Sequence, residues 1–211
     1  MIVEFFGPPG AGKTTVAEML AERRGARLFL CDGHRSPDGY LFGRSELRRR
    51  RAVALACQPA LLARTLQSWR ASGRGPALSW HINLARRNWM MRSLDETDWV
   101  LEEGPLSALC LAATESPSRW QPSQLVHLLQ HADLTVLMDV EPEVAARRVS
   151  ERSGILSDWS EEEVMAMTVK YRRVMRGVAD AIPAPVLRLD AMSAAEAADA
   201  VADTVTATLR A

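Results

Sequence analysis

A segment near the amino end has the residue types of a phosphate-binding loop. It reads GPPGAGKTT, and it satisfies the spacing G-x-x-x-x-G-K-[ST] in full between an apolar run and a helical pattern. Glycines there let backbone amides turn inward around an anion, and the following helix adds its positive end. We expect Lys13 to reach the β- and γ-phosphates of a nucleotide and Thr14 to bind Mg²⁺. The residues expected to hold the nucleotide are Gly7, Pro8, Pro9, Gly10, Ala11, Gly12, Lys13, Thr14 and Thr15.

Acidic residues follow two of the apolar runs. Glu102 and Glu103 come directly after WVL, and Asp32 follows RLFLC. A carboxylate beside the loop could bind Mg²⁺ or act as a base for an attacking hydroxyl. Because side chains alternate along a strand, we expect one glutamate of the pair to face the site. Glu103 is favoured, since it lies at the turn before Gly104, and Asp32 is the other candidate base.

Arginines form three groups that could bind phosphates. Arg148 and Arg152 lie four residues apart on a predicted helix, where they could clamp a transferring phosphoryl group. Arg86 and Arg87 precede the WVL run, and Arg35 follows the second apolar run. These last three are expected to position the acceptor if it carries a phosphate. The four arginines at 48–51 cover all sides of a helix, which is typical of a solvated face.

Short apolar runs alternate with helical patterns along the chain. Strands are predicted at 2–6, 27–31, 99–103, 134–140 and 186–190. Helices are predicted after the loop, within 44–96, and at about 121–131, 142–152 and 160–181, with a closing helix capped by Ser193 and Glu196. Alternation of this kind predicts a parallel sheet covered on both faces, with ligands at the carboxyl ends of its strands.

Composition indicates one domain over 1–211 without a dominant charge. Lys plus Arg and Asp plus Glu are both 26, so there is no basic field that would favour nucleic acid. No apolar run approaches the roughly 20 residues of a membrane span, and the amino end lacks a signal-peptide pattern, so we expect a cytoplasmic protein. The three cysteines have neither metal-ligand nor disulfide spacing and are expected to be buried thiols. A homodimer is one option for the oligomeric state.

Three segments together resemble the P-loop kinases of the thymidylate and nucleoside monophosphate kinase group. They are the loop, DWVLEEGPLSAL and ADLTVLMDVEPEVAARRVSERSG. The resemblance implies a three-layer α/β/α P-loop NTPase fold with a five-stranded parallel sheet in the order 2-3-1-4-5. It also implies ATP and Mg²⁺ as cofactors, a helical acceptor-binding insert at about 44–96 and an arginine-bearing lid at about 148–159.

The chain leaves that family pattern at two places. EEGP replaces the Asp-Arg-Tyr of thymidylate kinases after the third strand, and CDGHRSPDG replaces their Arg-Glu-Pro stretch after the second. The DGHR segment is similar to Asp-Gly-Asp-Asn-x-Arg of adenylyl-sulfate kinases, and its acid lies where deoxynucleoside kinases and some antibiotic-phosphorylating enzymes have a base.

These features predict an ATP-dependent phosphotransferase that moves the γ-phosphoryl group to a nucleotide, nucleoside or other hydroxyl-bearing metabolite. The alternatives are a nucleotide-dependent regulatory NTPase acting on a protein partner, and a binding module without catalysis. A GTP-specific switch is expected to carry Asn-Lys-x-Asp, which the sequence lacks.

Overall fold

The computed structural model describes residues 1–29, 35–36, 39–40, 58–61, 63, 76–92, 94, 97–115, 125–151, 159–190 and 192–208. Within these ranges the main sheet has five parallel strands, in the order β2-β5-β1-β6-β7. Their bounds are β1 Ile2–Phe6, β2 Arg27–Phe29, β5 Trp99–Leu101, β6 Leu134–Asp139 and β7 Val186–Asp190. The order is the predicted 2-3-1-4-5, so the predicted sheet is confirmed.

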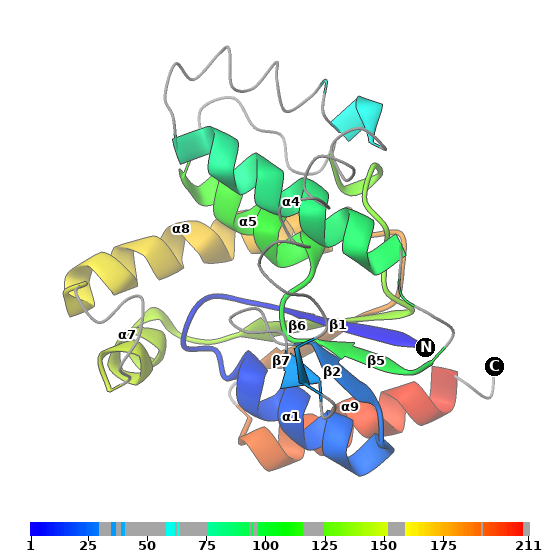
Figure 1. The fold of residues 1–211 in the computed structure, drawn as a ribbon. Helices are drawn as coiled ribbons and strands as arrows, with labels where there is room; N and C mark the ends of the chain where they lie inside the picture. The colour runs from blue at the N-terminus through cyan, green and yellow to red at the C-terminus, as the bar shows by residue number, and fades with distance from the viewer. Residues whose placement is uncertain are drawn as a thin grey trace.

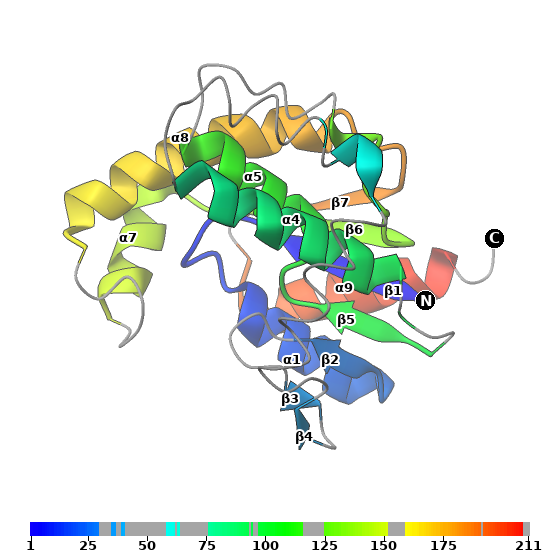
Figure 2. The ribbon, with the colours of Figure 1, turned by 45° about the horizontal axis from the view of Figure 1, so that its top comes forward.

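Helices cover both faces of this sheet, as Figure 1 shows. On one face lie α1 (Lys13–Arg24) and α9 (Ala194–Thr208), and on the other lie α4 (Pro76–Arg92), α5 (Pro105–Glu115) and α8 (Glu161–Ala179). The helix α7 (Pro142–Ser150) packs on α8 through Ala146, Val149 and Val164. The short antiparallel pair β3 (Arg35–Ser36) and β4 (Gly39–Tyr40) lies beside β2 (Figure 2).

Alternating side chains of β1 divide the core into two layers. Phe6 packs with residues of α5 and α8, whereas Val3 and Phe5 pack with residues of α1 and α9. All three are at most 1% exposed. Strands buried on both faces are typical of a parallel sheet, and burial of this apolar surface is the main stabilising contribution.

Two capping boxes fix the starts of helices. Ser193 Oγ accepts a hydrogen bond from the Glu196 amide, and the Glu196 carboxylate accepts one from the Ser193 amide, as predicted. Ser160 and Glu163 make the same reciprocal pair at the start of α8. Each pair satisfies amides that have no partner inside the helix.

Several predicted boundaries differ from the structure. β5 ends at Leu101 instead of continuing to 103, and the helix predicted at about 121–131 ends at Val126, while its residues 121–124 lie outside the described ones. The helix α5 was not predicted, because PLSALCLAATE is apolar on nearly all sides and lacks a helical polar stripe.

Other predictions fall partly on residues that are not described. In the predicted insert, the described part includes α4 and the short segment 58–61, and in the predicted lid it includes 148–151 and Trp159. Cys110 is a buried free thiol as expected, while Cys31 and Cys57 lie outside the described residues. No helix in the described ranges is both long and apolar enough to span a membrane.

Candidate active site

The glycine loop joins β1 to α1 at the carboxyl edge of the sheet. Gly10 and Gly12 have φ angles of 80° and 89°, a left-handed conformation that side chains with a Cβ rarely adopt. A Cβ on Gly7 would lie 2.5 Å from the Met138 carbonyl oxygen, and one on Gly10 would lie 2.5 Å from that of Ala145. The loop is thus pressed against β6 and α7, and its backbone forms a cradle of the kind that binds phosphates.

Lys13 lies inside this cradle. Its side chain is 6% exposed, and its Nζ donates hydrogen bonds to the carbonyl oxygens of Gly7 (3.0 Å) and Pro8 (3.1 Å). The same nitrogen lies 3.3 Å from Glu103 Oε1. An ammonium group held at the mouth of the loop is suited to binding phosphate oxygens.

Both glutamates of the turn after β5, which we call the acidic turn (residues 102–104), face the loop. Glu102 accepts a hydrogen bond from Thr14 Oγ1, and Glu103 forms an ion pair with Lys13. The expectation that only one of the two faces the site is therefore wrong. The alternation rule does not apply, because β5 ends at Leu101 and both residues lie in the turn.

Glu103 is shared between two cations. Its Oε2 lies 3.2 Å from Arg87 Nη1 in α4, while its Oε1 lies near Lys13. Burial acts to raise the pKa of Glu103, but Lys13 and Arg87 outweigh burial and lower that pKa to about 2. A carboxylate with such a low pKa accepts protons poorly, so its chemistry is that of a fixed anion.

Arg87 also binds the backbone of the acidic turn. Its Nη1 donates to the carbonyl oxygens of Glu103 (3.3 Å) and Gly104 (3.4 Å), and its side chain is 7% exposed. Its neighbour Arg86 is half-buried in α4. Of the predicted acceptor-binding arginines, Arg87 thus contacts the acidic turn, and the side chain of Arg35 is not among those described.

Arg148 contacts the loop from the other side. It projects from α7, and its Nη1 donates to the Gly10 carbonyl oxygen at 3.3 Å. Thr15, in the first turn of α1, is exposed. Asp32 and Arg152 lie outside the described residues, so their predicted roles stay predictions.

Two groups near the site were not found from the sequence. Glu4, in the middle of β1, is fully buried behind the acidic turn. Asp139, at the end of β6, binds Arg172 and Arg176 of α8. The sequence did contain a sign of Glu4, because it is the single acid in the apolar run IVEFF. It also contained a sign of the Asp139 partners, because Arg172 and Arg176 are four residues apart and so lie on one face of a helix.

The residues present fit a nucleotide with Mg²⁺. In the described parts of the chain, no group of three or more His, Cys, Asp or Glu side chains could hold a metal by itself. Mg²⁺ in kinase sites is normally bound through one or two protein oxygens together with phosphates and water. The Thr14 hydroxyl beside the Glu102 carboxylate, next to a glycine cradle, is such a donor set.

Comparisons with known proteins match the fold of the chain. A model of the ATPase family associated with various cellular activities (AAA) matches residues 3–62, which include the loop. A search of curated proteins finds no match.

Solved structures match over nearly the whole chain. A deoxyadenosine kinase from M. mycoides, with dCMP and dCDP bound, has a TM-score of 0.63 and 13% identity, and the match covers 98% of this chain and 99% of that one. A thymidylate kinase from Ehrlichia chaffeensis has a TM-score of 0.58 and 14% identity, with coverage of 97% and 98%. The YorR protein from Bacillus subtilis, in complex with phosphorylated GDP, has a TM-score of 0.57 and 15% identity, with coverage of 100% and 99%. The chain therefore has the fold of P-loop nucleoside and nucleotide kinases.

Proposed function

We propose that the protein is an ATP- and Mg²⁺-dependent phosphotransferase that moves the γ-phosphoryl group of ATP to a small-molecule acceptor. The acceptor is a nucleotide, a nucleoside or another hydroxyl-bearing metabolite. The observation that carries the proposal is the meeting of Lys13 and Thr14 with both carboxylates of the acidic turn. Likeness to kinases that act on nucleosides and nucleotides supports the same reaction class.

The donor side uses the loop and its neighbours. Backbone amides of the loop and the ammonium of Lys13 bind the donor phosphates. Arg148, which already contacts Gly10, stabilises the charge that develops on the transferred group. Arg152, four residues further along, is proposed to complete this clamp.

Thr14 is the proposed Mg²⁺ ligand, and the geometry favours Glu102 over Glu103 as the carboxylate beside it. A bound Mg²⁺ would neutralise charge on the β- and γ-phosphates. The sequence favoured Glu103 for this task. In this proposal Glu103 instead positions Lys13 and Arg87 through its two ion pairs.

The acceptor side depends on whether the acceptor is an alcohol or a phosphate. For an alcohol, Asp32 is the proposed base, because the lowered pKa of Glu103 makes that residue a poor proton acceptor. For a phosphate acceptor, which is already ionised, Arg35, Arg86 and Arg87 are the proposed ligands. Replacement of Asp32 by Asn separates these cases, since only the alcohol kinase loses turnover by orders of magnitude.

The decisive experiment measures ADP formation from ATP in the presence of a panel of nucleosides, nucleoside monophosphates and other small alcohols. We expect one class of acceptor to stimulate ADP formation, and we expect Lys13→Ala to abolish the stimulated rate. A thermal-shift screen with a non-hydrolysable ATP analogue identifies the acceptor independently, because a true acceptor adds its own stabilisation to that of the nucleotide.

Two outcomes would contradict the proposal. Hydrolysis that no metabolite stimulates, but that a protein does, would indicate a regulatory NTPase. A Lys13→Ala variant with normal nucleotide binding and turnover would exclude the loop as the donor site.

A further inference from the structure

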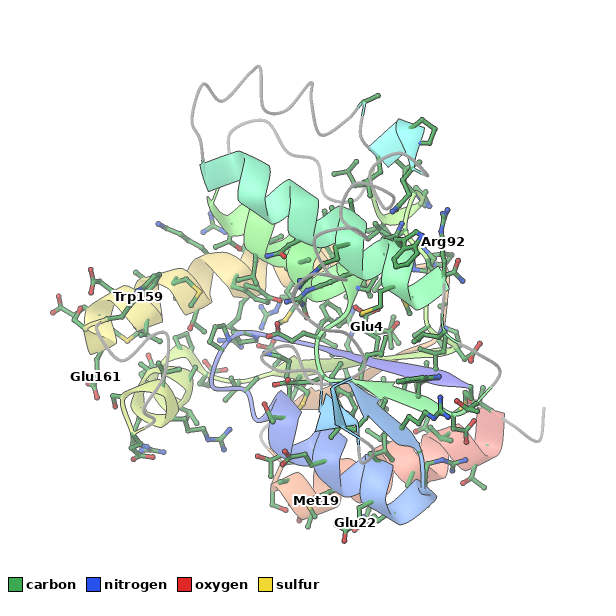
Figure 3. The ribbon with its side chains drawn as sticks, in the orientation of Figure 1. Glu4, Met19, Glu22, Arg92, Trp159 and Glu161 are labelled. Carbon is green, nitrogen blue, oxygen red and sulfur yellow. The ribbon has the colours of Figure 1, made fainter. Side chains whose placement is uncertain are left out.

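Glu4 is an acid in the core of the protein. It occupies the middle of β1, its exposed fraction is 0%, and it lies on the face of the sheet that α4 and α5 cover (Figure 3). A carboxyl group in such a place lowers stability unless its polar atoms are bound. Its retention among apolar neighbours therefore needs a physical reason.

The Glu4 carboxyl group binds the backbone where the acidic turn enters α5. Its Oε1 accepts a hydrogen bond from the Leu106 amide at 2.9 Å, whereas its buried Oε2 has no hydrogen-bond partner among the described residues. A Cβ on Gly104 would overlap this carboxyl group, so glycine makes room for it. Glu4 thus satisfies the amide of Leu106, in the first turn of α5, which has no partner inside the helix.

Arg87 holds the same turn from the side of α4. It donates to the carbonyl oxygens of Glu103 and Gly104, while Glu4 accepts from the Leu106 amide just after them. Arg87 thus binds the acidic turn through its carbonyl groups, and Glu4 binds the start of α5 that follows directly. The two carboxylates that this turn carries reach Thr14 and Lys13.

We infer that Glu4 is a positioning residue, which fixes the acidic turn so that Glu102 and Glu103 meet Thr14 and Lys13 of the loop. Glu4 does not touch the nucleotide in this scheme and acts through the backbone of Gly104 and Leu106. The inference rests on the proposed function, because the geometry that Glu4 fixes is that of the donor and Mg²⁺ site. Small displacements of such groups are costly to a reaction that depends on positioning.

The chemistry of Glu4 suggests a matched pair of substitutions. Burial raises the pKa of Glu4 to about 8, so the folded protein holds this carboxyl group largely protonated at neutral pH. Glu4→Gln keeps an oxygen acceptor for Leu106 and adds no charge. Glu4→Met has similar length but leaves the Leu106 amide without its acceptor.

The test compares these two variants in the binding of a non-hydrolysable ATP analogue at increasing Mg²⁺. We expect Glu4→Met to raise the Mg²⁺ concentration for half-maximal binding by roughly tenfold, because the carboxylate of Glu102 moves away from Thr14. The affinity without Mg²⁺ should not fall, because the same movement takes the Glu103 anion away from Lys13. We expect Glu4→Gln to stay within about threefold of wild type in both measurements.

A control variant separates positioning from loss of stability. Val201→Ala removes buried volume from α9 on the opposite face of the sheet, so it should lower the melting temperature and leave the Mg²⁺ requirement unchanged. If Glu4→Met does not fold, Glu4→Asp replaces it, since it keeps the acid but withdraws it from Leu106.

The outcomes distinguish this inference from the proposed function. A folded Glu4→Met protein with a normal Mg²⁺ requirement would show that Glu4 is only structural, and the proposed function would stand. An equal rise in Glu4→Gln would show that the acceptor oxygen is not the cause. Wild-type protein that binds no nucleotide would overturn both.

Discussion

At the scale of single residues, Glu102 and Glu103 are adjacent in sequence but have different chemical surroundings. Glu102 contacts a hydroxyl, and Glu103 contacts two cations. The sequence could show that a carboxylate belongs near the loop. It could not show which one, because the answer depends on where β5 ends, and strand ends are not fixed by an apolar pattern.

This difference predicts opposite effects of two neutral substitutions. Glu102→Gln should raise the Mg²⁺ concentration for half-maximal binding of an ATP analogue by about tenfold, because a carboxylate beside Thr14 is lost. Glu103→Gln should instead strengthen binding without Mg²⁺, since it removes an anion that competes with phosphate for Lys13. Isothermal titration with and without Mg²⁺ checks both. Equal effects of the two substitutions on the Mg²⁺ requirement would contradict separate roles.

At the scale of secondary structure, the sequence predicted strands better than it predicted their surroundings. Apolar runs identified all five strands of the main sheet, since buried parallel strands contain few polar residues. The helix α5 was missed for the same reason, because a helix buried on nearly every side has no amphipathic period. The contact between Glu4 and Leu106, just after the acidic turn, was also missed, because these residues are 102 positions apart in the sequence.

One element contact makes a further prediction about stability. Asp139, at the end of β6, binds Arg172 (2.5 Å) and Arg176 (2.8 Å) of α8, and its side chain is 9% exposed. Burial acts to raise the pKa of Asp139, but the hydrogen bonds and charges of the two arginines lower it overall. These contacts attach α8 to the sheet beside the start of α7, which carries Arg148.

We expect Asp139→Asn to lower the free energy of unfolding by about 1.5–3 kcal/mol, as for a lost charged hydrogen bond in a partly buried site. The control is Asp180→Asn, whose partner Arg188 is 52% exposed. Exposed pairs contribute about 0–1 kcal/mol, so this variant should be close to wild type. Urea unfolding followed by circular dichroism measures both, and equal effects would show that the Asp139 contacts are no stronger than a surface pair.

At the scale of the whole molecule, Glu4 and Glu103 make stability depend on pH in opposite directions. The pKa of Glu4 is raised from 4.5 to about 8, so its contribution is complete below about pH 4.5 and is lost as pH rises through 8. The pKa of Glu103 is lowered to about 2, so its contribution is complete above about pH 4.5 and is lost as pH falls through 2. The two windows do not overlap, and each can be measured separately.

We therefore predict that wild type loses stability relative to Glu4→Gln as pH rises from 5 to 8, by at most about 1.4 kcal/mol per pH unit. The quantity to compare is the difference in free energy of unfolding between wild type and Glu4→Gln. Burial lowers the pKa of His131, so this residue also makes stability depend on pH, but its effect is common to both proteins and cancels in the difference. Urea unfolding at a series of pH values measures it. A constant difference would mean that Glu4 is already ionised in the folded protein. The expected outcome is that the stability of wild type relative to Glu4→Gln falls as pH rises, while Glu4→Gln keeps a normal Mg²⁺ requirement. The proton on Glu4 would then contribute to stability, and its acceptor oxygen would position the acidic turn.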